Sequence, residues 1–156
     1  MQIDFTEERQ KIGVHTCPGG DKHSTHSADV DYSELLPLLF EMNAGRFYMQ
    51  FASEEDQECV LNIVGEHSHD DQTIFLGVTD VIGVTDVNGP EVESAEDVQN
   101  TILRAVNYLP IERLGTTDDC GFSPFGDDRS TARRTAFSKI EARVEGTKMA
   151  SETLGV

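Results

Sequence analysis

The chain has 156 residues and a formal net charge of −17, from 29 acidic and 12 basic side chains, a length that fits one domain with a hydrophobic core. A surface of this sign repels phosphate backbones and anionic lipids, so we expect neither nucleic acid nor a membrane as a partner. No apolar run approaches the roughly 20 residues of a membrane helix, and the start is too polar and acidic for a targeting peptide. Three cysteines cannot close a disulfide framework. We therefore expect a cytoplasmic protein.

Strand-like and helix-like segments alternate along the chain. Short apolar runs predict four strands, at residues 12–17, 46–52, 73–78 and 114–118. Apolar residues at helical spacing, with capping residues before them, predict four helices, at about residues 31–42, 54–64, 94–107 and 131–149. The cap of the second helix is predicted to be Ser53. The apolar sides are predicted to be Leu35, Leu38, Leu39 and Met42 in the first helix, and Ala136, Ile140 and Val144 in the last.

This alternation is typical of parallel α/β folds. No linker or low-complexity segment divides the chain, so we expect residues 1–156 to form a single structural unit. Functional residues in such folds gather at the carboxyl ends of the strands. The search for a site therefore begins at those ends.

Three potential metal ligands lie at the carboxyl ends of the first and the fourth predicted strands. His15 and Cys17 are two residues apart, which places both side chains on one face of a strand, and Cys120 lies just past the end of the last strand. Two sulfurs and one imidazole suit Zn²⁺, and three protein ligands leave one position open, as in catalytic zinc sites. The alternative is that these residues only pack in the core, because free cysteine behaves as a small hydrophobe.

The distance between those strands constrains the architecture. In a flat sheet the first and fourth strands lie about 14 Å apart, because neighbours are about 4.8 Å apart. A closed barrel with inward-pointing ligands brings their ends together more easily than an open sheet. Four βα units are only half of an eight-stranded barrel. The chain is therefore expected to be part of a longer polypeptide or to be completed by a second copy.

Several motifs resemble one known family. They are I-G-V-H-T-C-P-G-G-D at 12–21, S-A-E-D-V at 94–98, L-P-I-E-R-L at 109–114 and T-T-D-D-C-G-F-S-P-F at 116–125. These resemble the carboxyl-terminal half of the cobalamin-independent methionine synthases, with the greatest likeness to the branch that includes epoxyalkane:coenzyme M transferase. The resemblance extends from residue 5 to about residue 150.

The resemblance implies a TIM (β/α)₈ barrel of which this chain supplies the carboxyl-terminal half, with zinc held by His15, Cys17 and Cys120. It also implies a zinc-dependent thiol alkyl- or methyltransferase, which activates a small thiol of the homocysteine or coenzyme M class for attack on an alkyl donor. Alternatives are the addition of a thiol to an epoxide and an inactive, truncated half-barrel. The expected assembly is a homo-oligomer or part of a longer chain.

Two positions depart from the family pattern. Methionine synthases carry a glutamate as a further zinc ligand where this chain has Gln50, and a histidine where it has Asn88. Glutamine is an uncharged and poorer ligand, and asparagine cannot serve as a general acid. Both changes favour a relative that uses another thiol or another alkyl donor.

The remaining candidates have structural alternatives of similar weight. Asp118 and Asp119 are candidates for orienting the ligands, or they cap the turn at the strand end. His26 is a candidate for substrate contact, or it is a solvated loop residue. Cys59 has no metal-binding neighbours in the sequence and is expected to be a packing residue.

Overall fold

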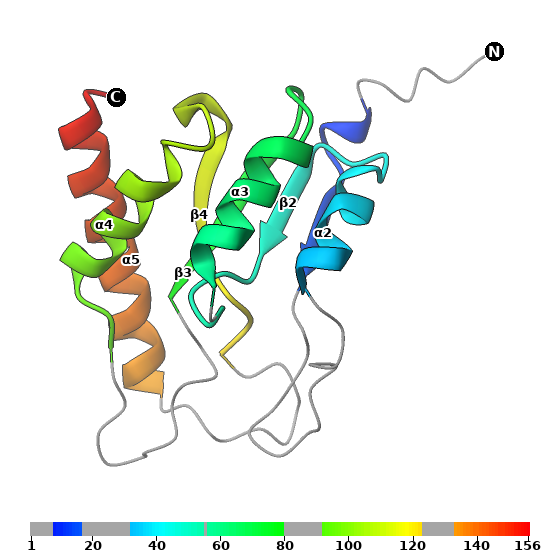
Figure 1. Ribbon diagram of the computed structural model, residues 1–156. Coiled ribbons are helices and arrows are strands. Elements are labelled where there is room, and N and C mark those ends of the chain that lie inside the picture. The colour runs from blue at the N-terminus through cyan, green and yellow to red at the C-terminus, as the bar shows by residue number, and fades with distance from the viewer. Residues whose placement is uncertain (1–7, 17–31, 55, 80–91, 123–132) are drawn as a thin grey trace.

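Four parallel strands form one sheet with the strand order β1-β2-β3-β4 (Figure 1). The computed structural model describes residues 8–16, 32–54, 56–79, 92–122 and 133–156. The strands are β1 (Gly13–Thr16), β2 (Arg46–Met49), β3 (Thr73–Thr79) and β4 (Leu114–Asp118). The predicted α/β class with a parallel sheet is confirmed.

All four carboxyl ends lie at one edge of the sheet, because the strands are parallel. Thr16 of β1 pairs with Met49 of β2, which in turn pairs with Leu76 of β3. The pairing of β3 with β4 shifts register between Gly77 and Thr79. This irregularity lies next to the segment that follows β4, which is the segment that carries Cys120.

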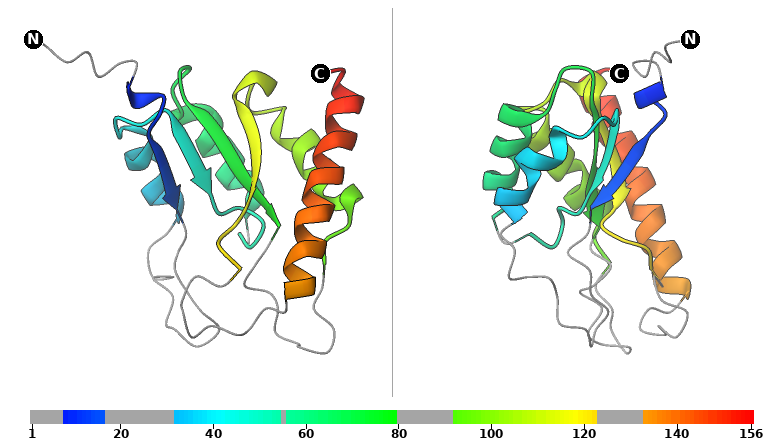
Figure 2. Two further views of the ribbon diagram at one scale, coloured as in Figure 1. Left: turned by 180° about the vertical axis from the view of Figure 1, so that it is seen from behind. Right: turned by 90° about the vertical axis from the view of Figure 1, so that its right-hand side faces the viewer.

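Among the described residues, four helices with defined bounds accompany the strands, and a short 3₁₀ turn, η1 (Ile111–Arg113), precedes β4. In Figures 1 and 2, α2 and α3 cover one face of the sheet, while α4 and α5 pack on each other beside β3 and β4. In the part of the chain that the structure describes, no helix covers the opposite face, and none is long and apolar enough to cross a membrane. The helices are α2 (Tyr32–Phe40), α3 (Gln57–His67), α4 (Ala95–Ala105) and α5 (Arg133–Leu154).

The hydrophobic core lies between the sheet and its helices. Side chains alternate along a strand, so Phe47 and Met49 are fully buried under the helices while Tyr48, between them, faces the other side. Tyr48 stacks there on Phe75 of β3, with ring centroids 4.5 Å apart and planes 10° apart. The buried members from the helices include Leu36, Phe40, Val60, Leu61, Val64, Val98, Ile102 and Ala150.

The first helix turns a different side inward from the one predicted. Leu36 and Phe40 are fully buried, whereas Leu38 is 70% exposed. Apolar residues occupy two overlapping stripes of this short helix, and the stripe with the large phenylalanine packs. Phe40 makes an edge contact with Phe47, with ring centroids 5.3 Å apart.

The last helix also differs from the prediction. Its inward residues include Lys139 and Gly146, and Val144 is 58% exposed. A Cβ at Gly146 would lie only 2.5 Å from the carbonyl oxygen of Ala95, so α5 and α4 approach too closely for a larger side chain. Apolar spacing alone could not reveal this close approach.

The cap of α4 is as the sequence predicts, but that of α3 is not. Ser94 and Asp97 form a capping box at the start of α4. Asp56 caps α3, accepting a hydrogen bond from the Cys59 amide, and the predicted cap Ser53 bonds elsewhere. The true partner of Ser53 is Asp119, which bears directly on the site.

Candidate metal and thiol site

His15 and Cys120 meet at the carboxyl edge of the sheet. Their Nε2 and Sγ atoms are 3.8 Å apart, although the residues are 105 positions apart in the chain. His15 is exposed at the end of β1, and Cys120 is half-buried two residues after β4. The structure therefore brings together the two described members of the predicted ligand set.

The distance between these atoms fits a shared zinc ion. With Zn–S near 2.3 Å, Zn–N near 2.05 Å and a tetrahedral angle, the nitrogen and sulfur of two ligands lie about 3.6 Å apart. The 3.8 Å separation needs only a small adjustment to reach that value. Imidazole and thiolate are also the donors that zinc prefers.

Cys17 and His26, together with Asn88, lie outside the described residues. Among the residues that the structure does describe, no group of three or more His, Cys, Asp or Glu side chains is placed to hold a metal ion. The third predicted ligand thus stays a prediction. Cys59, predicted to be a packing residue, is exposed on α3, because it lies outside the buried stripe of Val60, Leu61 and Val64.

Within the described residues, His15 and Cys120 meet across the carboxyl edge of the four strands themselves. The sheet is open, with β2 and β3 between β1 and β4. In Figures 1 and 2 the segment after β4 turns back across the end of β3 toward β2. A Cβ at Gly77 would lie 2.9 Å from the Cα of Asp119, which shows how closely that backbone passes over β3.

Gln50 directly follows β2, at the same edge of the sheet as the ligand pair, and carries an unsatisfied acceptor. The residue is 4% exposed, and its amide nitrogen donates to Glu54 Oε1 over 2.9 Å. Its Oε1 is one of two buried side-chain polar atoms among the described residues that have no hydrogen-bond partner. A buried acceptor left unpaired costs about 1–3 kcal/mol. This orphan oxygen is therefore suited to a metal ion or to a donor on a substrate.

Asp119 is fully buried and accepts four hydrogen bonds from the segment after β2. Oδ1 accepts from the amides of Phe51 and Ala52, and Oδ2 accepts from the amide and the hydroxyl of Ser53. Burial raises the pKa of Asp119 to about 7, against the lowering effect of these donors. The carboxyl group thus ties the residue before Cys120 to the residues after Gln50.

Asp118 has different partners. Its Oδ1 accepts from Thr79 Oγ1 over 2.6 Å and from Arg143 Nε over 3.1 Å. These contacts join β4 to β3 and to α5. Of the two aspartates predicted to orient the ligands, Asp119 accepts hydrogen bonds from the segment after β2, whereas Asp118 accepts them from β3 and α5.

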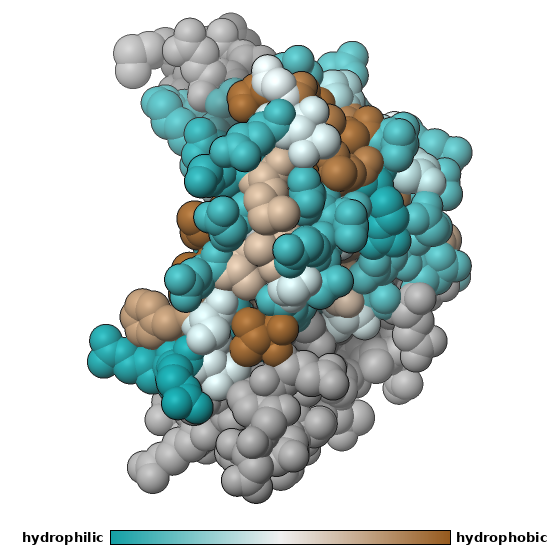
Figure 3. Space-filling model, turned by 90° about the vertical axis from the view of Figure 1, so that its left-hand side faces the viewer, coloured by the Kyte–Doolittle hydropathy of each residue, from teal (hydrophilic) through white to brown (hydrophobic). Residues whose placement is uncertain are grey.

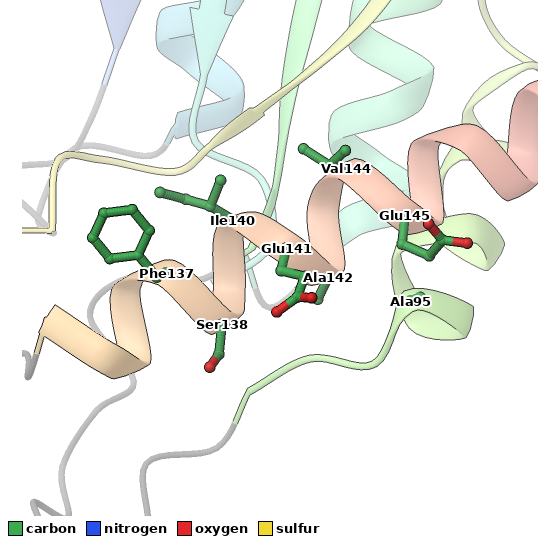
Figure 4. Close-up of a pocket in the computed structure, with 8 residues that line it drawn as sticks. All are labelled: Ala95, Phe137, Ser138, Ile140, Glu141, Ala142, Val144 and Glu145. Atoms are coloured by element: carbon green, nitrogen blue, oxygen red, sulfur yellow. The ribbon is translucent and has the colours of Figure 1, made fainter.

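A surface depression on α5 is separate from this group of residues. It is lined by Phe137, Ile140 and Val144 with their helix neighbours and by Ala95 of α4 (Figure 4). Figure 3, which views the molecule from the side of α4 and α5, shows hydrophobic patches scattered in a mostly hydrophilic surface. None of the candidate site residues lines the depression.

Comparison with known proteins identifies the family. Residues 6–145 match the family described as "Cobalamin-independent synthase, Catalytic domain". The chain belongs to this family, whose members form TIM barrels, and its four βα units are a part of such a barrel.

Individual relatives agree with this assignment. A methionine synthase of Saccharolobus solfataricus is 28% identical over 144 residues, which cover 92% of this chain and 36% of that protein. A 5-methyltetrahydropteroyltriglutamate–homocysteine methyltransferase of Neisseria meningitidis is 24% identical over 80% of this chain and 15% of that protein. The chain therefore spans about a third or less of the length of these relatives.

A solved structure agrees in fold. The B12-independent methionine synthase of Shewanella sp. W3-18-1, in complex with selenomethionine, superposes with a TM-score of 0.67 at 19% identity. The match covers 91% of this chain and 39% of that one. At this identity the likeness establishes the fold.

Sequence reasoning identified the ligand pair but missed the arrangement that supports it. Ser53 was predicted only as a helix cap, and Gly77 was predicted only as a residue of the third strand. A glycine in a strand interior often marks a close approach of another backbone. Gly77 in a strand and the Asp-Asp-Cys sequence after β4 were together the signal in the sequence that could have indicated this arrangement.

Proposed function

We propose that this chain is the metal-binding part of a zinc-dependent S-alkyltransferase of the methionine synthase type. The observation that carries the proposal is the 3.8 Å approach of His15 Nε2 to Cys120 Sγ at the carboxyl edge of the sheet. His15, Cys17 and Cys120 would hold the zinc, with Gln50 Oε1 available at the same edge. As one structural unit, residues 1–156 would form the carboxyl-terminal half of the barrel.

The bound zinc would supply activation of a thiol, because coordination deprotonates sulfur near neutral pH and the thiolate is the nucleophile. The protein's own residues would do the rest. His15 and Cys120 would orient the ion from two strands. The side-chain amide of Gln50 is neutral, so the site would carry one negative charge fewer than it would with a glutamate at this position.

The substrates proposed are a small thiol of the homocysteine or coenzyme M class and an alkyl donor. A thiol added to an epoxide remains the alternative reaction. The methyltransferase named among the relatives supports a methyl donor, and the neutral Gln50 supports a different donor or thiol.

A second candidate is that the chain has no activity until another half of the barrel is added. The uncovered sheet face supports it, because the stacked Tyr48 and Phe75 are only partly buried there within the described residues. A second copy or a longer polypeptide would cover this face. The two candidates differ in whether the isolated chain holds zinc.

The test is the zinc content per chain in protein purified without added metal. We expect close to one zinc per chain, close to zero in Cys120→Ala, and an unchanged value in the control Cys59→Ala, whose thiol is exposed on α3. Loss of thiol alkylation in Cys120→Ala would accompany the loss of metal. Equal zinc in Cys120→Ala and in the unaltered chain would contradict the assigned site.

A further inference from the structure

Asp119 connects two parts of the molecule that the sheet itself keeps apart. Its carboxylate lies 2.8 Å from the Phe51 amide, 3.0 Å from the Ala52 amide, and 2.9 and 3.0 Å from the amide and hydroxyl of Ser53. Those donors follow β2, whereas Asp119 follows β4. In the strand order these two strands are not neighbours, because β3 lies between them.

The carboxylate reaches β2 by crossing β3 at a residue without a side chain. A Cβ placed on Gly77 would lie 1.9 Å from Asp119 Oδ1 and 2.9 Å from its Cγ. Any other residue at this position would occupy the space that the carboxylate uses. The crossing is secured further by the bond from the Asp119 amide to the carbonyl of Thr79, at 3.0 Å.

The residues at the two ends of this connection are those of the candidate site. Cys120 follows Asp119 directly, and Gln50 directly precedes Phe51. Fixing Asp119 to the amides after β2 therefore fixes the backbone of Cys120 relative to that of Gln50.

We propose that Asp119 is a positioning residue for the metal and thiol site: its carboxylate, passing over Gly77, sets the separation between the Cys120 sulfur and the end of β2. The inference rests on the proposed zinc site. It goes beyond that site because it assigns the geometry of the ligands to a residue that contacts neither metal nor substrate. Partners that orient ligands typically contribute about 10- to 100-fold to metal affinity.

A merely structural carboxylate would affect stability and leave the ligand geometry unchanged. Asp56 is the matched control, because it also bonds an amide of this region, that of Cys59, and caps α3 without reaching β4. Asp119→Asn keeps the shape of the side chain but presents an NH₂ group where one carboxylate oxygen accepted hydrogen bonds. It should therefore lose the bonds of one oxygen and retain those of the other.

The experiment is titration of the metal-free chain with Co²⁺ alone, followed by visible and near-ultraviolet absorption. Tetrahedral Co²⁺ absorbs strongly in the visible range, and its sulfur-to-metal band reports the thiolate ligands. We expect Asp119→Asn to bind Co²⁺ at least about tenfold more weakly, with shifted visible bands. Asp56→Ala should keep the affinity and the spectrum of the unaltered chain, even if it unfolds at lower temperature.

Two further variants make each outcome decisive. If far-ultraviolet circular dichroism shows that Asp119→Asn does not fold, Ser53→Ala replaces it, since it removes only the hydroxyl bond, and it should weaken Co²⁺ binding to a smaller extent. A folded Asp119→Asn or Ser53→Ala with unchanged affinity and spectrum would overturn the positioning role. If Cys120→Ala binds Co²⁺ as the unaltered chain does, the zinc site itself is wrong and the inference falls with it.

Discussion

Replacing Gly77 by alanine tests the contact on which the arrangement of the site depends. The new Cβ would lie 1.9 Å from Asp119 Oδ1, so the carboxylate must move away from it. Oδ1 accepts the hydrogen bonds of Phe51 and Ala52. Hydrogen bonds to a charged group contribute about 1.5–3 kcal/mol each. Loss of these two alone predicts a fall of about 3–6 kcal/mol in the free energy of unfolding.

The assay is urea unfolding of the metal-free chain, followed by far-ultraviolet circular dichroism. Gly121→Ala is the matched control, because a Cβ at that nearby glycine meets nothing within 4 Å. It should change the free energy of unfolding by no more than about 0.5 kcal/mol. If Gly77→Ala is destabilised no more than Gly121→Ala, the carboxylate does not occupy the space over β3 and the reasoning is refuted.

Three other predictions concern α4, α5 and the segment before them. Ser94→Ala should lower the free energy of unfolding by about 1 kcal/mol. The hydroxyl of Ser94 lowers the pKa of the exposed Asp97, so the stability that this carboxylate contributes is present above its ordinary pKa and is lost as pH falls through the lowered pKa. In the variant, an NMR titration should find the pKa of Asp97 closer to its usual value. Glu93→Gln removes the carboxylate that lies 2.7 Å from the ammonium of Lys139, which is 3% exposed, and should lower the free energy of unfolding by about 3–5 kcal/mol. Lys139→Met should lower it much less. Equal losses of stability in thermal unfolding would contradict the pairing. Gly146→Val should separate α5 from α4 and lower the melting temperature, whereas an unchanged melting temperature would mean that the two helices are not in close contact.

The order and class of the elements could be predicted from the sequence because each depends on local pattern. The strand at Leu114–Asp118 agrees with prediction to the residue, and the N-cap of α4 is Ser94, the first residue of the predicted helix at 94–107. The inward sides of α2 and α5 were wrong because they depend on which neighbour a helix meets. The burial of Lys139 follows from its pairing with Glu93, which no periodicity can indicate.

The candidate site divides in the same way. His15 and Cys120 could be chosen from residue chemistry and from their places near the carboxyl ends of strands, and the structure brings them together. The means by which they meet could not be predicted, because strand spacing does not indicate the path of the segment after β4. The turn over Gly77 depends on the carboxylate of Asp119, whose hydrogen bonds span 66 or more positions in the chain, and on the missing side chain of Gly77 beneath it.

The turn after β4 has a consequence for engineering. The turn spans the width of β3. The approach of His15 to Cys120 therefore depends on four successive strands and one crossing segment, whatever encloses them. A transplanted or circularly permuted barrel that preserves this run should preserve the pair, while a cut between β3 and the turn should destroy it. Within the described residues, four strands and one crossing segment place an imidazole nitrogen and a cysteine sulfur 3.8 Å apart.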